Sequence, residues 1–402
     1  MGIPSGEPLH ARDRDGTHRQ HDRGEAASQP RVGLYSGLIV AALTLAGPAT
    51  AETLRIATWN PDLSRKGPGL LLQDIQRGKD PQIAAAVDVI ATINPDILLL
   101  TSFDWDYEGR ALDAFIARLN EAGADYPHRF AGQPNTGLAT GLDLDGNGRS
   151  GEARDAQGYG RFMGQGGMAL LSRLPIRADY IVDFTPMLWA DLPGSLIDGA
   201  GLSPDVRAVQ RLSTTAHWDI RLVLPEESPL HLWAWTATPP VFDGPEDRNG
   251  RRNHDEAALW LHYLEGRLGQ HPPEAPIVIL GDANLDPIDS EGRPDALLTL
   301  LDHPVFLDPQ PRSEGALTAA QEGINAAHRG DPTLDTADWS DDGPGNLRVD
   351  YVLPSRDLAV MASGVFWPTP DDPMAETVER ASAHRLVWVD VELPSGTRIP
   401  RK

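Results

Sequence analysis

Five polar side chains lie at or beside the ends of predicted strands, and their types can bind a metal ion and carry a proton. They are Asn60, Asp282, Asn284, Asp350 and His384. Carboxylate and amide oxygens are hard ligands of the kind that Mg²⁺ takes, and histidine changes its charge near neutral pH. Each surrounding motif is common when taken singly; the tetrapeptide 281–284, for example, also occurs as a simple turn. The prediction therefore depends on all of them occurring together and in this order.

Short apolar runs and amphipathic segments alternate around these side chains. They predict strands over residues 54–58, 97–100, 168–171, 231–235, 276–280, 349–353 and 386–391, and helices over residues 81–92, 112–119 and 256–268. Runs such as 97–100 are apolar throughout, which favours sheets whose outer faces are covered by helices. Because no repeat or low-complexity linker interrupts the chain after residue 52, we expect one α/β domain.

Four motifs, read in order, resemble the endonuclease/exonuclease/phosphatase superfamily. They are Ala57-Thr58-Trp59-Asn60, Gly281-Asp282-Ala283-Asn284, Arg348-Val349-Asp350-Tyr351 and Ser382-Ala383-His384-Arg385. The resemblance extends over nearly all of residues 52–394, is strongest to an exported bacterial branch, and leaves 395–402 as a short tail. It implies a four-layer α/β/β/α sandwich whose active site lies where loops leave the paired sheets.

The resemblance also implies the chemistry and the role of each residue. The family hydrolyses phosphoesters with a divalent ion, Mg²⁺ or Mn²⁺, and phosphoryl transfer depends mostly on positioning and charge neutralisation. Asn60 would contact the metal region, Asp282 would orient the attacking water and Asn284 would hold the phosphate. Asp350 would fix His384, whose positive charge would support the phosphate.

Three positions depart from the family pattern. Ser102 follows the apolar strand 97–100 where the family places a metal-binding glutamate, Ala383 replaces an aspartate beside His384, and Thr236 replaces a histidine. A neutral hydroxyl cannot supply the charge that draws Mg²⁺ out of water. The substitutions favour a protein whose catalysis is impaired or lost. The alternative is an active metal-dependent phosphodiesterase or nuclease with substitute ligands, in which Asp104 joins Asn60 at the metal.

The segment 143–148 (DLDGNG) resembles the start of a calcium loop. Asp143, Asp145 and Asn147 supply oxygens at positions one, three and five, and a glycine stands at position six. The twelfth position is Arg154 instead of a bidentate glutamate. A Ca²⁺ site and a turn with solvated carboxylates both remain open.

The segment 243–253 mixes arginines with acidic residues. Arg248 or Arg251 could hold a phosphate through forked hydrogen bonds; the alternative is an ion-paired loop that caps a helix beginning near Asp255. His217, beside Asp219, is interpreted as a structural residue.

The N-terminal region and the composition bear on location and partners. The apolar run 37–46 and the small residues Ala49-Thr50-Ala51 predict a secretory signal that ends at Ala51, preceded by a polar leader. We therefore expect a secreted or periplasmic protein with no transmembrane segment in its mature part. The formal charge of −23 disfavours unspecific nucleic-acid binding, which leaves a phosphoester-bearing small molecule or an unknown partner. The chain has no cysteine, and this excludes disulfides and thiolate chemistry.

Overall fold

The computed structural model describes residues 53–393 of the 402-residue chain. The predicted leader, signal peptide and C-terminal tail lie outside the described residues. The predicted strands form two sheets, and every predicted strand is present with boundaries shifted by a few residues.

The first sheet has six strands in the order β12-β13-β1-β2-β4-β3. They span Val360–Phe366 (β12), Leu386–Glu392 (β13), Thr53–Trp59 (β1), Ile97–Phe103 (β2), Gly167–Ser172 (β4) and His128–Phe130 (β3). β1 and β2 run parallel, whereas β13 lies antiparallel to β1. This sheet therefore joins the first and last strands of the described chain.

The second sheet has five strands in the order β11-β8-β7-β6-β5. They span Asp350–Pro354 (β11), Ile277–Asp282 (β8), Pro229–Thr236 (β7), Ala216–Val223 (β6) and Val182–Asp183 (β5). β7 and β8 run parallel, and β8 and β11 are antiparallel. A short separate pair, Ala337–Asp338 (β9) and Asn346–Leu347 (β10), lies before β11.

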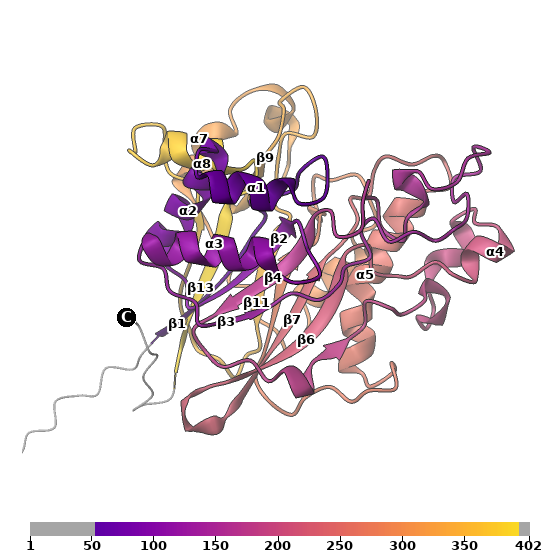
Figure 1. Ribbon diagram of the computed structural model, residues 1–402, viewed down its shortest axis with the longest axis horizontal. Coiled ribbons are helices and arrows are strands. Elements are labelled where there is room, and N and C mark those ends of the chain that lie inside the picture. Colours follow the sequence, from indigo (N-terminus) through magenta and orange to yellow (C-terminus); the bar gives the residue numbers. More distant parts are fainter. Residues whose placement is uncertain (1–52, 394–402) are drawn as a thin grey trace, which may run out of the picture. The chain divides into compact units, whose positions relative to one another are not determined.

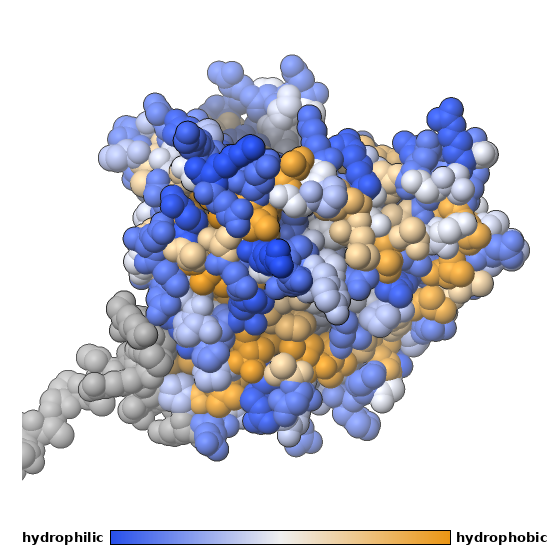
Figure 2. Space-filling model, in the orientation of Figure 1, coloured by the Kyte–Doolittle hydropathy of each residue, from blue (hydrophilic) through white to orange (hydrophobic). Residues whose placement is uncertain are grey.

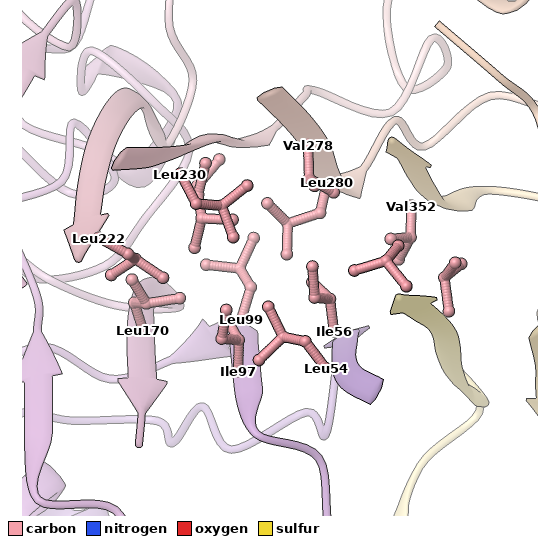
Figure 3. Close-up of a cluster of buried hydrophobic side chains, with 14 of the residues drawn as sticks. Leu54, Ile56, Ile97, Leu99, Leu170, Leu222, Leu230, Val278, Leu280 and Val352 are labelled. Carbon is pink, nitrogen blue, oxygen red and sulfur yellow. The ribbon is translucent and has the colours of Figure 1, made fainter. Parts of the chain in front are cut away.

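Side chains that alternate along the strands divide the interior into layers. Leu54 and Ile56 of β1 join Val278 and Leu280 of β8 in one buried cluster between the sheets (Figure 3). Residues next to these in each strand point to the opposite face of the sheet. Ala57 packs in the cluster under the helices of the first sheet, and Ile279 packs in the cluster under α5. Successive strand residues point to opposite faces of a sheet, so both sheets are buried on both faces.

Helices cover the two outer faces (Figure 1). Leu70–Arg77 (α1), Pro81–Ile93 (α2), Arg110–Glu121 (α3) and Ala375–Ala381 (α8) pack on the first sheet. Arg248–Leu264 (α5) and Asp295–Leu301 (α6) pack on the second. Two further short helices are Pro204–Arg207 (α4) and Glu314–Ala319 (α7). The four-layer α/β/β/α fold expected from the sequence is confirmed.

The helix expected over residues 256–268 begins and ends earlier, as α5. Its start, residues 248–256, has no apolar side chain and therefore no apolar periodicity. Arg252, Asn253 and Glu256 are nevertheless buried and hydrogen-bonded. It stops before Gly266, whose φ of 69° does not continue a helix. The prediction of a capping loop over 243–253 was thus wrong for its second half, which is helical.

No helix within residues 53–393 is long and apolar enough to cross a membrane.

Candidate active site

The predicted site residues meet where the two sheets end together. Asp282 is the last residue of β8 and Asp350 the first of β11, and their Cα atoms are register partners. Asn60 follows β1 and His384 precedes β13 in the other sheet. Each sheet therefore contributes two of these four side chains, which we call the catalytic cluster after the role that the resemblance predicts for them.

Hydrogen bonds connect the catalytic cluster directly. His384 Nδ1 lies 2.9 Å from Asp350 Oδ2. The amide nitrogen of Asn60 lies 3.3 Å from Asp282 Oδ2, to which it donates, and 3.4 Å from His384 Nε2. The backbone N–H of Asn284 donates to Asp282 Oδ1 over 2.8 Å. The five residues predicted from the sequence are thus brought together.

Neighbouring groups hold His384 and Asp350 in place. The Thr336 hydroxyl donates to Asp350 Oδ2 over 3.1 Å, and the indole of Trp59 donates to the His384 carbonyl over 2.9 Å. Ser382 Oγ accepts the His384 N–H and donates to the carbonyl of Asn60. The sequence did not indicate Thr336, because it precedes Asp350 by 14 residues in a loop with no motif of its own.

Burial and charge shift the titration of the catalytic cluster. Burial alone would lower the pKa of His384, but the Asp350 carboxylate and its hydrogen bond outweigh this and raise the pKa to about 9. Without a bound metal ion, this raised pKa favours the protonated form of His384 at neutral pH. Burial and the nearby Asp350 raise the pKa of Asp282, while His384 opposes that rise. A buried carboxyl with a raised pKa beside a histidinium is typical of catalytic sites.

Gly281 precedes Asp282 at a point where two backbones touch. Its φ is 149°, and a Cβ atom there would lie 1.9 Å from the Trp235 carbonyl oxygen. We expect Gly281→Ala to destabilise the fold by more than 2 kcal/mol, roughly the cost of a backbone shift plus strain. Urea unfolding followed by tryptophan fluorescence would measure it. Gly67→Ala is the control, because a Cβ at residue 67 meets only the Leu70 side chain, at 3.4 Å or more. Equal midpoints for the two variants would contradict the expectation.

The catalytic cluster has the donor set and spacing of a metal site. Asp282, Asp350 and His384 each offer a ligand atom, and these atoms lie within 4.8 Å of one another. Asp350 Oδ1 is buried and has no hydrogen-bond partner, so it can accept a cation or a donor. The residues present therefore fit a divalent ion, to which His384 would bind through Nε2 after losing its proton there. An ion there would supply positive charge for an anionic ligand.

The three substituted positions border the catalytic cluster. Ser102 has a φ of 52° and lies in a β-bulge between Leu100 and Phe103. Its side chain therefore does not follow the regular alternation of side chains along β2. The Cα of Thr236 is the register partner of Asp282, and its buried hydroxyl has no hydrogen-bond partner. Ala383 is exposed beside His384. None of the three supplies a charge.

Asp104 is tied to backbone groups. It is buried, and its two oxygens accept the N–H groups of Gly166 and Arg65, each over 2.9 Å. Burial raises the pKa of Asp104 against these hydrogen bonds. Asp104 is not in the carboxylate–histidine group that could hold an ion, so its part in metal binding remains a prediction.

The 143–148 loop folds around its first carboxylate. Asp143 accepts the N–H groups of Gly146 and Gly148, and Asp145 pairs with Arg154 over 3.0 Å. Ligand atoms of Asp143, Asp145 and Asp155 lie within 4.8 Å of one another. A Ca²⁺ site here would thus draw on Asp155, one residue past the twelfth loop position, and not on a residue at that position.

The two arginines proposed as phosphate contacts, both in the first turn of α5, make different contacts. Arg251 Nε donates to the Glu246 carbonyl, and its guanidinium packs against Gly199. Arg248 lines a large cavity and makes one long hydrogen bond, 3.4 Å, to the Leu144 carbonyl. Of the two, only Arg248 lines this cavity, and its contact with phosphate remains a prediction.

His217 is a core residue. It is fully buried, its Nδ1 lies 2.7 Å from Ser213 Oγ, and its Nε2 lies 3.1 Å from the Glu256 carbonyl. Since a carbonyl only accepts, Nε2 carries the proton and Nδ1 accepts from the serine. The Ser–His pair is thus enclosed and makes a structural contribution.

Burial lowers the pKa of His217 to about 3, against an ordinary value of 6.5. The unfolded chain binds a proton at His217 more readily than the folded chain. The contribution of neutral His217 to the free energy of unfolding is therefore fully present above pH 6.5, and it falls by up to about 4 kcal/mol as the pH drops towards 3. We expect His217→Gln to flatten the loss of melting temperature across this range. The exposed His271→Gln is the control, and an unchanged pH slope in His217→Gln would refute the assignment.

This fold, with an Asp–His pair and a carboxylate–amide turn at the sheet ends, defines a phosphoesterase-type protein. The chain belongs to the Endonuclease/Exonuclease/phosphatase family, whose sequence profile matches residues 73–384. The family is generally dependent on divalent metals. A search of curated proteins finds no match.

Solved structures align with this one at low sequence identity. An endonuclease/exonuclease/phosphatase from Beutenbergia cavernae aligns with a TM-score of 0.50 and 18% identity, over 85% of this chain and 72% of that one. Sphingomyelinase C from Streptomyces griseocarneus has a TM-score of 0.45 and 13% identity, over 84% and 99% of the two chains. The human Nocturnin catalytic domain with bound sulfate has a TM-score of 0.44 and 13% identity, over 85% and 94%.

Proposed function

We propose that this protein binds a small phosphoester at the catalytic cluster and that its Mg²⁺-dependent hydrolysis of that ester is strongly reduced. The observation that carries the proposal is the contrast within one site. Asp282, Asp350 and His384 keep connected, buried positions, whereas Ser102 offers only a hydroxyl at the bulged end of β2. Phosphate affinity comes from the histidinium, and the missing carboxylate weakens Mg²⁺ binding.

The test is hydrolysis of bis(p-nitrophenyl) phosphate by the full chain, with Mg²⁺, Mn²⁺ or Ca²⁺, beside inorganic phosphate binding by calorimetry. The proposal expects slow or undetectable turnover with Mg²⁺ and phosphate binding that His384→Ala weakens. Rapid Mg²⁺-dependent turnover abolished by His384→Ala would overturn the reduced activity. Phosphate binding equal in the wild type and His384→Ala would overturn the binding site.

A second candidate is an active hydrolase whose ion is held by Asp282, Asp350 and His384. The spacing of their ligand atoms, within 4.8 Å, favours it. A histidine nitrogen suits Mn²⁺ better than Mg²⁺, which prefers oxygen. Turnover with Mn²⁺ alone would support this candidate. If Asp104→Asn then abolished that turnover while the fold was kept, Asp104 would join the ligands.

We also propose that the protein works outside the cytoplasm, because the apolar run 37–46 precedes a small-residue cleavage site at Ala49-Thr50-Ala51. N-terminal sequencing of the protein recovered from the periplasm or medium would test this. Retention in the cytoplasm would contradict the location, and a first residue other than Glu52 would contradict the cleavage site.

A further inference from the structure

A cavity of about 1070 Å³ lies beside the catalytic cluster and contains none of its residues. We call it the loop cavity. Its wall is formed by the first turns of α5, the segment that follows β7, and the loops around residues 144–159 and 200–202. Figure 2 shows hydrophobic and hydrophilic residues interspersed over the neighbourhood of α4, which follows the last of these loops. The volume is ample for a small organic molecule.

The loop cavity is close to the catalytic cluster along the chain and in space. Thr238 in its wall comes two residues after Thr236, the register partner of Asp282. Two residues span at most about 7 Å and paired strands lie about 4.8 Å apart, so the Cα atoms of Thr238 and Asp282 lie within roughly 12 Å. Asn253 fixes this arrangement, because its amide donates to the carbonyls of Thr238 and Ala283, each over 2.8 Å. Thr238 in the wall of the loop cavity therefore lies within the length of a small organic ligand from Asp282.

Of the three arginines that line the loop cavity, one is available to bind an anion. Arg154 pairs with Asp145, and Arg252 donates to four backbone carbonyls. Arg248 makes only its long bond to the Leu144 carbonyl and has no carboxylate partner among the described residues. Of the acidic residues in the wall, Asp243 and Glu246 already accept backbone N–H groups. A ligand with negative charge would thus find Arg248 available, in a protein that is otherwise strongly acidic.

Two aromatic side chains in the wall are open to water. Tyr159 is 62% exposed and Phe242 is 91% exposed, and their rings do not contact each other in the described part of the chain. Exposed rings at the mouth of a cavity offer flat apolar surface to a planar ligand group.

We propose that the loop cavity binds the organic part of the phosphoester substrate, and that this part carries an aromatic ring and a negative charge. The ring lies against Tyr159 and Phe242, and the charge faces Arg248. The assignment of the ligand as a phosphoester rests on the proposed function, since it places the ester phosphate at the catalytic cluster. Specificity then resides in the loops and is separate from the residues that handle the phosphate.

Calorimetric binding of two phosphonates, naphthylmethylphosphonate and methylphosphonate, tests the proposal because neither can be hydrolysed and only the first has a ring. The wild type is expected to bind the naphthyl compound more tightly. Tyr159→Ala/Phe242→Ala should weaken naphthylmethylphosphonate at least roughly tenfold and leave methylphosphonate unchanged. Tyr107→Ala, which removes a ring that is 89% exposed but outside the loop cavity, is the control.

A second comparison tests the proposed contact of Arg248 with a negative charge. Its probe is benzene-1,4-diphosphonate, an aromatic ring with two anionic groups. Arg248→Gln should weaken it at least fivefold, whereas Arg161→Gln, at an exposed arginine outside the loop cavity, should not. Equal losses in the cavity and control variants would overturn the proposal. If His384→Ala abolishes binding and the cavity variants do not, the proposed function stands and this inference fails. If only the cavity variants lose binding, the loop cavity stands and the proposed phosphate site fails.

Discussion

The Ser102→Glu/Ala383→Asp double variant is expected to hydrolyse bis(p-nitrophenyl) phosphate with Mg²⁺ at least about 100-fold faster than the wild type. Ser102 lies in the bulge at the end of β2, where the resemblance places the metal-binding glutamate of the family. Ala383 is exposed and its side chain has room to become longer. Two added carboxylates restore the charge that Mg²⁺ needs. Initial rates over a Mg²⁺ titration would measure the gain.

Two matched variants separate a restored metal site from added charge. Ser228→Glu/Ala362→Asp introduces the same two carboxylates at exposed positions away from the catalytic cluster and should leave the rate unchanged. His384→Ala in the double-variant background should remove the gained activity. A double variant no faster than the wild type, with its fold intact, would mean that the loss at Ser102 does not limit the reaction.

Glu256→Gln is expected to lower the free energy of unfolding by about 2–4 kcal/mol. The buried Glu256 carboxylate accepts the N–H of Thr214 over 2.5 Å and that of Thr238 over 2.7 Å. It thereby joins α5 to the chain entering β6 and to the chain leaving β7. An amide can accept only one of these N–H groups and turns a donor towards the other, while the buried Arg252 loses a neighbouring negative charge.

Urea unfolding followed by tryptophan fluorescence would measure this loss. The control is Glu265→Gln, an exposed residue at the end of the same helix, which should change the stability by less than about 0.5 kcal/mol. Coincident unfolding curves for Glu256→Gln and the wild type would show that the two backbone groups find other partners.

The sequence predicted the strands because their apolar runs have no other stable location than a covered sheet. It also predicted Asp282, Asp350 and His384 through the resemblance of their motifs, although what each does remains untested. It did not indicate Thr336, which supports Asp350 from a loop without periodicity. It also missed the start of α5, where buried polar residues replace the apolar stripe and are stabilised by contacts with distant segments. Such contacts depend on the tertiary fold and leave no local pattern.

The position of β13 between β1 and β12 has a consequence for the order of events during synthesis. Asn60 stands at the beginning of the domain and His384 near its end, so the catalytic cluster is formed by a pairing of very high sequence separation. Such pairings are slow and come late in folding. A ribosome-bound or truncated chain that stops before His384 has both aspartates but no histidine, and its first sheet lacks β13. A chain that ends before His384 therefore cannot form the catalytic cluster, and premature termination there yields fragments without it.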